Sequence, residues 1–146
     1  MKVIFLDVDG VLNSAKDGFS HHLESEHHLQ LLDEIVKKSG AEIVLSSSWR
    51  KIPSLRSVLE KKLSNYGITI YGETESIPGT RGTEIKDWLD HCQKPIQEFV
   101  ILDDDSDMDE YTETKLVKTS YMEGLQPEHV TRALEILNGK KESAIG

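Results

Sequence analysis

Residues 3–12 read Val-Ile-Phe-Leu-Asp-Val-Asp-Gly-Val-Leu, and this segment is the most informative part of the sequence. Four apolar, β-prone residues predict a short buried strand, and Asp7 and Asp9 lie at its carboxyl end. Open parallel α/β sheets bind their ligands at this end of the strands. Two carboxylates this close repel each other unless a divalent cation or a proton lies between them. One carboxylate could attack a substrate while the other transfers protons.

A second acidic cluster has the same placement. Asp103, Asp104 and Asp105 directly follow the apolar run Phe-Val-Ile-Leu at residues 99–102. An ordinary Asp-Gly turn would explain the end of the first motif, but it would explain neither Asp7 nor a second strand ending in aspartates. Two such endings in one small chain favour a shared metal site.

The composition suits one domain, residues 1–146, with a hydrophobic core and a frayed tail at 139–146, since 37% of the residues are hydrophobic and 29% are charged. No membrane partner is expected, because no apolar run approaches the length of a membrane span and no signal-peptide pattern is visible. The single cysteine, Cys92, excludes an internal disulfide and favours a cytoplasmic location. The net charge of −9 disfavours non-specific adhesion to nucleic acid, but not a site that grips one phosphate with arginines.

Predicted strands and helices alternate along the chain. The expected strands are residues 3–6, 42–45, 68–71, 99–102 and 116–119. The first expected helix covers residues 26–38, and the second begins at Pro53 and is stopped by Gly67. The third has Thr83 as a plausible N-cap, and the fourth starts near Pro127. This alternation predicts an α/β fold, a Rossmann-like three-layer sandwich with a mainly parallel five-stranded sheet. No insertion is long enough for a separate cap domain.

The order of these motifs resembles the haloacid dehalogenase (HAD) superfamily of phosphohydrolases. The shared elements are Asp7-x-Asp9-Gly10, a strand ending in Ser46, a basic residue, and a strand followed by Asp103-Asp104. More narrowly, Leu-Asp-Val-Asp-Gly-Val-Leu-Asn, Leu-Ser-Ser-Ser-Trp-Arg, Arg-Gly-Thr-Glu-Ile and Ile-Leu-Asp-Asp-Asp resemble the phosphatase domains of Swiss Army Knife RNA repair proteins. They are also similar in outline to the 3′-phosphatase half of polynucleotide kinase-phosphatases. The resemblance covers nearly the whole chain and implies a capless HAD-like fold.

This resemblance implies a Mg²⁺-dependent phosphomonoesterase that acts through an aspartyl-phosphate. Asp7 would be the nucleophile, and Asp9 would protonate the leaving oxygen and then activate water. Because dehalogenase members lack the second aspartate, Asp9 disfavours dehalogenation. Mg²⁺ would be held by Asp7, the backbone carbonyl of Asp9, Asp103 and a further aspartate. Either Asp104 or Asp107 fits that last position, and Asp104 is preferred.

The resemblance also implies a phosphate-binding set. Ser46 would donate its hydroxyl to a phosphate oxygen, and Ser47 would add a backbone N–H. A fixed cation must balance the phosphate charge, and Arg81 is preferred over Lys86 for that role. Arg50 is a second candidate for gripping phosphate bidentately. A surface ion pair is the ordinary alternative for each arginine.

Histidines and tryptophans are two further groups of candidate residues. Four histidines cluster in one segment, namely His21, His22, His27 and His28. Their spacing matches no standard zinc pattern, so a loop near the mouth of the site is favoured over a metal centre. Trp49 and Trp88 are expected in the core rather than as platforms for stacked bases.

The sequence is compatible with three functions. Capless HAD proteins often act on large substrates, whose own bulk closes the site. This favours a phosphatase for the 3′-phosphate end of RNA or DNA, or for another large phosphorylated substrate. The alternatives are a small-molecule phosphatase resembling a 5′-nucleotidase and a non-catalytic phosphate-binding module. The module is disfavoured by the intact set of Asp7, Asp9, Ser46, Arg81 and Asp103.

Overall fold

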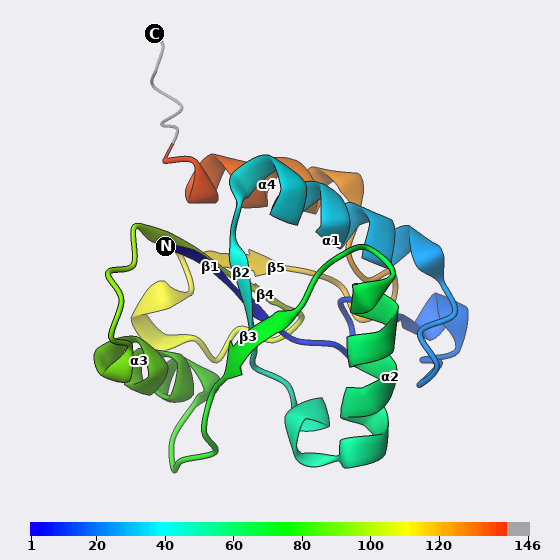
Figure 1. Cartoon of the computed structure of the whole chain (residues 1–146), viewed down its shortest axis with the longest axis horizontal. Coiled ribbons are helices and arrows are strands. Elements are labelled where there is room, and N and C mark those ends of the chain that lie inside the picture. Colours follow the sequence, from blue (N-terminus) through cyan, green and yellow to red (C-terminus); the bar gives the residue numbers. More distant parts are fainter. Residues whose placement is uncertain (140–146) are drawn as a thin grey trace, which may run out of the picture.

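The computed structural model describes residues 1–139 and shows five strands in one sheet, in the order β3-β2-β1-β4-β5 (Figure 1). The strands are β1 (Lys2–Leu6), β2 (Glu42–Leu45), β3 (Ile70–Glu73), β4 (Glu98–Asp103) and β5 (Leu116–Lys118). All four neighbouring pairs are parallel. The predicted α/β fold is therefore confirmed, with a sheet that is wholly rather than mainly parallel.

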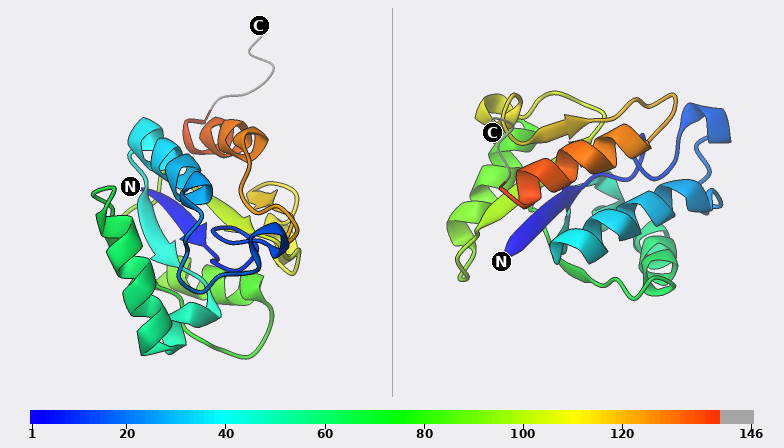
Figure 2. Two further views of the ribbon diagram at one scale, coloured as in Figure 1. Left: turned by 90° about the vertical axis from the view of Figure 1, so that its right-hand side faces the viewer. Right: turned by 90° about the horizontal axis from the view of Figure 1, so that it is seen from above.

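Helices cover both faces of the sheet. The α-helices are α1 (Glu26–Ser39), α2 (Pro53–Ser64), α3 (Arg81–His91) and α4 (Pro127–Leu137), and the short 3₁₀ helices are η1 (Ala15–Asp17), η2 (Ser48–Lys51) and η3 (Asp109–Tyr111). Helices α1 and α4 lie side by side over one face (Figures 1 and 2), and buried residues of α2 belong to the same core. Helix α3 and η3 pack on the opposite face. This is the three-layer arrangement expected for parallel strands joined by helical crossovers.

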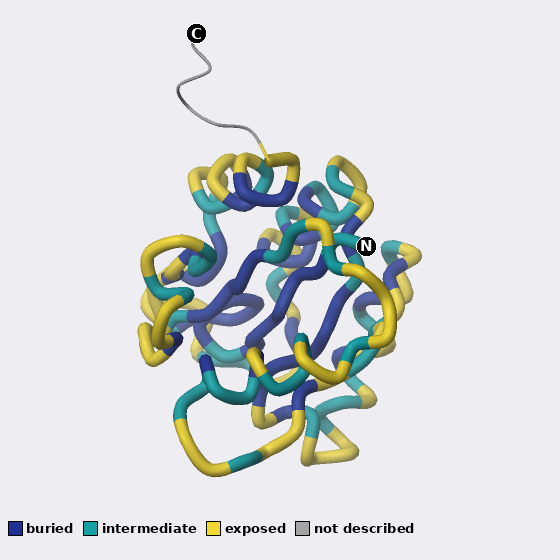
Figure 3. The backbone as a smooth tube through the Cα atoms, turned by 90° about the vertical axis from the view of Figure 1, so that its left-hand side faces the viewer, coloured by how far each residue is buried: buried dark blue, intermediate teal, exposed yellow. Residues whose placement is uncertain are grey.

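The central strand β1 supplies both layers of the core. Ile4 and Leu6 point toward α1, α2 and α4, whereas Val3 and Phe5 point toward α3. All four residues are fully buried. Strands coloured as buried lie at the centre of the molecule in Figure 3. Burial on both faces explains why the strand is a continuous apolar run without the polar alternation of a half-exposed strand.

Two predicted boundaries are wrong. Strand β3 begins at Ile70 rather than at residue 68, because Ile68 still belongs to the turn that ends α2, where its N–H donates to the Leu63 carbonyl at 3.0 Å. Helix α3 has Thr80 rather than Thr83 as its N-cap. The Thr80 hydroxyl accepts from the Thr83 N–H at 3.1 Å, and the Thr83 hydroxyl accepts from the Thr80 N–H at 3.3 Å. This reciprocal cap makes Arg81 the first residue of the helix instead of a loop residue.

The strand order brings three strand ends together. From β1 the chain builds β2 and β3 on one side and then crosses to β4 and β5 on the other. The ladder also continues past the strands, since the Ser46 N–H donates to the Leu6 carbonyl at 2.8 Å and the Asp7 N–H donates to the Leu102 carbonyl at 3.0 Å. The ends of β2, β1 and β4 therefore form one edge at the point where the chain reverses direction across the sheet, which is where such sheets bind ligands.

None of the helices within residues 1–139 has the length and apolar character needed to cross a membrane.

Candidate active site

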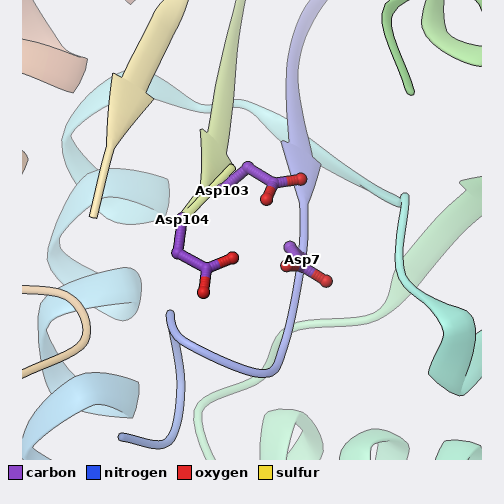
Figure 4. A group of neighbouring side chains, drawn as sticks. All are labelled: Asp7, Asp103 and Asp104. Carbon is purple, nitrogen blue, oxygen red and sulfur yellow. The ribbon is translucent and has the colours of Figure 1, made fainter. Parts of the chain in front are cut away.

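Three carboxylates converge at this edge of the sheet. Asp7 follows β1, Asp103 ends β4, and Asp104 comes next in the chain. One oxygen from each lies within 4.8 Å of the others, and Figure 4 shows the side chains grouped around a common space. Three close carboxylate oxygens are the kind of donor set that hard divalent cations such as Mg²⁺ prefer. The residues therefore fit the predicted metal, and Asp104, but not Asp107, belongs to this group of neighbouring carboxylates.

Burial disfavours the ionised form of these three carboxylates. Desolvation raises the pKa of Asp7 to about 6, although the nearby Arg81 guanidinium works in the opposite direction. Desolvation and the charge of Asp7 raise the pKa of Asp103 to about 8. The pKa of Asp104 is also raised, again mainly by burial. Without a cation, the Asp7–Asp103 pair therefore retains a proton near neutral pH, and a divalent cation could replace that proton.

Arg81 extends from the start of α3 into the same space. Its Nη1 lies 3.9 Å from an oxygen of Asp7 and 3.7 Å from an oxygen of Asp103. The same nitrogen donates to the Ser46 hydroxyl oxygen at 3.4 Å. Lys86, the alternative cation, instead faces Asp90 at 3.5 Å on the exposed side of α3. Arg81 is thus the cation that the fold brings to the three strand ends, together with Ser46.

Gly10 leaves room for Asp104. Its φ of +84° lies in the left-handed region that favours glycine. A Cβ at this position would lie 2.3 Å from Oδ2 of Asp104, closer than any real contact. The Gly10 carbonyl also accepts from the Thr119 hydroxyl at 2.6 Å, which ties the loop to the end of β5. The glycine after the two aspartates is therefore required both by the turn and by the third carboxylate.

Asp107 has a structural position rather than a place in the carboxylate cluster. Its Oδ2 accepts from the Arg81 N–H at 3.2 Å, and its carbonyl accepts from the Gly82 N–H at 3.0 Å. A Cβ on Gly82 would lie 2.6 Å from the Met108 backbone, so only glycine permits this approach. Asp107 therefore caps the helix that carries Arg81 and helps to position that side chain.

Ser47 and Arg50 lie in the turn after β2. The Ser47 hydroxyl accepts from the Trp49 N–H at 3.1 Å and so caps η2. The Arg50 guanidinium is mostly buried; its Nη1 donates to the Ser47 carbonyl at 2.7 Å, and its Nη2 lies 3.5 Å from Glu84. Both residues are near the strand ends, but Arg50 is already held by two acceptors. Direct phosphate contact by Ser47 and by Arg50 stays a prediction.

Asp9 is held by two residues that were not predicted to have a role at the site. Its Oδ1 accepts from Asn13 Nδ2 at 2.9 Å, and its Oδ2 accepts from the indole N–H of Trp49 at 3.2 Å. Trp49 is buried, as expected of a core residue, yet it also contacts a candidate catalytic carboxylate. The sequence signal for Trp49 was its position three residues after Ser46, but hydrophobic patterning alone does not reveal a polar contact.

The histidines do not converge on a metal centre. The ring of His21 packs edge-on against Trp49, with centroids 5.6 Å apart, beside the candidate site. His28 lies buried in α1, where its Nδ1 is 3.0 Å from the Leu125 carbonyl and its Nε2 is 3.1 Å from Asp17. Among residues 1–139, the carboxylates of Asp7, Asp103 and Asp104 form the one group of potential ligands close enough to share an ion.

Comparison with known protein families gives one match, over residues 3–130, to the family described as "HAD domain in Swiss Army Knife RNA repair proteins". The match includes the ends of β1, β2 and β4 together with Arg81. No curated protein and no solved structure matches the chain significantly.

Proposed function

We propose, from the premise that this chain belongs to the family of HAD domains in Swiss Army Knife RNA repair proteins, that it is a Mg²⁺-dependent phosphomonoesterase with Asp7 as its nucleophile. The observation that carries this proposal is the position of Asp7. It lies at the end of the central strand, beside two further carboxylates and one arginine, with Asp9 two residues away. Such a group can accept a phosphate, attack it and transfer a proton without further cofactors besides the cation.

The metal would be held by Asp7, Asp103 and Asp104, with the Asp9 carbonyl as a further ligand. A bound Mg²⁺ supplies positive charge that neutralises the carboxylates and the phosphate oxygens. The raised pKa values of Asp7 and Asp103 support this assignment, because burial disfavours the charged carboxylates and a bound cation would offset that cost.

Different side chains of the protein then carry out the separate steps of the reaction. A carboxylate oxygen of Asp7 attacks phosphorus, and the bond from phosphorus to the ester oxygen breaks with its electron pair on that oxygen. Asp9 donates the proton that the leaving oxygen needs. In the second half, Asp9 takes a proton from water, the hydroxide attacks phosphorus, and inorganic phosphate leaves as the Asp7 carboxylate is restored. Ser46 and Arg81 hold the phosphate oxygens in both halves.

The test of this proposal is turnover of p-nitrophenyl phosphate with Mg²⁺. Asp7→Asn should abolish turnover and the acid-stable phosphoenzyme, because an amide keeps the shape of the side chain but does not attack phosphorus. The matched control is Asp105→Asn, which removes an exposed aspartate of the second acidic cluster. Turnover by Asp7→Asn close to that of the control would reject Asp7 as the nucleophile, and no turnover by the native protein would favour a phosphate-binding module.

For the substrate, the proposal is a nucleic-acid 3′-phosphate end. The support is the family and a hollow of about 250 Å³ beside Arg81, lined also by Ser48, Arg50 and Lys51. The Lys51 ammonium donates to the Ser76 hydroxyl at 2.7 Å, and no ion pair to Lys51 is present within residues 1–139. Lys51 is therefore available to a neighbouring phosphodiester, whereas Arg50 is already paired with Glu84.

This substrate assignment predicts a difference between two ligands. The kcat/KM for a 3′-phosphorylated oligonucleotide should exceed that for the matching mononucleoside 3′-phosphate, and the advantage should shrink as salt rises. Lys51→Gln should remove much of the advantage and make the slope of log(kcat/KM) against log[salt] less negative by roughly 0.7, the value for one phosphate contact on a single strand. Lys38→Gln on α1, whose ammonium pairs with Glu34, is the control. Equal efficiency on both substrates at low salt would favour a small-molecule phosphatase.

A further inference from the structure

The carboxylate of Asp9 is held at both of its oxygens by segments that are far apart in the chain. Asn13 Nδ2 donates to Oδ1 at 2.9 Å from the loop after β1. The Trp49 indole N–H donates to Oδ2 at 3.2 Å from the turn after β2. A carboxylate on a half-buried loop can otherwise rotate freely, so two donors on opposite oxygens fix its orientation.

Both donors are themselves immobile. Asn13 is 1% exposed, and its Oδ1 accepts from the Gly10 N–H at 3.0 Å, which fixes the plane of its amide. Trp49 is also 1% exposed. Its backbone N–H donates to the Ser47 hydroxyl, and the His21 ring packs against its indole. The two donor atoms are therefore positioned by the fold before any substrate arrives, which is the condition for effective orientation of a reacting group.

The chemistry of the donors suits proton transfer. An indole N–H and a carboxamide N–H are neutral, so they orient Asp9 without forming a permanent ion pair with it. A lysine or arginine in the same place would compete with the reacting proton for the carboxylate. Each carboxylate oxygen has about two acceptor sites, so one bond to each oxygen leaves sites for the proton in transit.

We infer that Asn13 and Trp49 are positioning residues that hold the Asp9 carboxylate in the orientation needed to protonate the leaving oxygen. This inference rests on the proposed phosphatase function and adds two residues to it. The ordinary alternative is that Asn13 only closes a turn and Trp49 only fills the core. The two views differ in one measurable respect, because only the positioning role depends on how much the leaving group needs a proton.

The experiment compares two phosphate esters in Mg²⁺, p-nitrophenyl phosphate and an alkyl phosphate such as glycerol 2-phosphate. The nitrophenolate leaves without assistance, whereas the alkoxide must be protonated as it leaves. Trp49→Phe keeps an aromatic ring but removes the N–H donor. We expect its kcat/KM on the alkyl ester, which reports only the steps up to departure of the alcohol, to fall roughly tenfold or more. Its kcat/KM on p-nitrophenyl phosphate should stay within about threefold of the native value.

Trp88→Phe is the matched control. Trp88 packs edge-on against Phe5 on the α3 side of the sheet, with ring centroids 5.5 Å apart. Any loss from this change should be the same for both esters. If Trp49→Phe folds poorly in a thermal melt, Asn13→Asp replaces it. That change keeps the acceptor for the Gly10 N–H, removes the donor to Asp9 and puts a like charge beside its Oδ1. Both effects turn the Asp9 carboxylate away, so kcat/KM should again fall selectively on the alkyl ester.

The Asp9→Asn background separates the inference from the proposed function. Adding Trp49→Phe to Asp9→Asn should cause no further selective loss on the alkyl ester, because the acid that the indole positions is already absent. If Asp9→Asn itself lowers kcat/KM equally on both esters, the proposed role of Asp9 as the acid fails and the inference fails with it. If Asp9→Asn lowers kcat/KM selectively on the alkyl ester, but Trp49→Phe and Asn13→Asp lower kcat/KM equally on both esters, the positioning inference alone is overturned.

Discussion

Raising the pH in the absence of metal should destabilise this protein through the Asp7–Asp103 pair. Burial raises the pKa of Asp7 to about 6 and, together with the charge of Asp7, raises that of Asp103 to about 8. An aspartate in the unfolded chain has a pKa near 3.9. The folded state therefore holds extra protons above pH 4, and the stability that these protons provide is lost as the pH rises through the folded-state values.

The magnitude follows from the number of protons. Between pH 6 and pH 8 the pair retains about one proton, whereas both carboxylates are ionised in the unfolded chain. One proton of difference lowers the free energy of unfolding by about 1.4 kcal/mol per pH unit, or about 3 kcal/mol over this interval. The side chain of Asp103 is only 3% exposed and that of Asp7 11%, so solvent screening removes little of this effect. A loss of this size is a large part of the 5–15 kcal/mol typical of a domain.

The assay is urea unfolding at pH 6, 7 and 8 in EDTA, for the native protein and for Asp103→Asn. The variant keeps the shape of the side chain but not the titrating group, so histidines contribute equally to both proteins, including His129, whose pKa burial lowers. The native protein should lose about 3 kcal/mol more than the variant between pH 6 and pH 8. Saturating Mg²⁺ should flatten the native curve, because the cation replaces the proton between the carboxylates.

Parallel pH curves for the two proteins in EDTA would refute this reasoning. They would mean that the two carboxylates are solvated well enough to ionise together. An unchanged native curve in Mg²⁺ would separately contradict the assignment of this cluster as the metal site.

The remaining predictions concern the geometry around the same carboxylates. Gly10→Ala should cost roughly 1–3 kcal/mol of stability and also weaken Mg²⁺ binding in calorimetry, because the new Cβ displaces Asp104. The control Gly40→Ala, at a similar φ with open space around it, should cost stability alone. Equal Mg²⁺ affinity in the two variants would contradict the fit of Gly10 against Asp104. Ca²⁺ should bind in place of Mg²⁺ but support little turnover, since its larger and looser shell misplaces the attacking Asp7; full activity with Ca²⁺ would argue against a tightly positioned nucleophile. Arg81→Ala should lower kcat/KM roughly 100-fold on oligonucleotide and mononucleoside alike, as expected for a residue that serves the reacting phosphate; a loss confined to the oligonucleotide would move Arg81 to substrate recognition.

Local sequence patterns predicted the strands that carry the candidate active site. The apolar run before Asp7, the run before Asp103 and the run before Ser46 each form a buried strand, and their alternation with helices predicts a parallel sheet. Parallel strands end at a common edge, so the clustering of these side chains follows from the order of the elements. The boundary errors at β3 and α3 arose where turn and capping hydrogen bonds, rather than hydrophobic periodicity, decide the first residue.

Contacts between turns could not be predicted from the sequence and become visible in the folded chain. Trp49 has the pattern of a core residue, and only the packing of η2 against the β1 loop aims its N–H at Asp9, 40 positions earlier in the chain. Arg50 and Lys51 are adjacent cations in the sequence, yet the fold pairs the first with Glu84 and leaves the second beside the hollow. Which strands form, and which polar side chains follow them, can be predicted from the sequence because both depend on short-range periodicity and residue type. Which donor meets which carboxylate depends on distances across the fold, which no local pattern encodes.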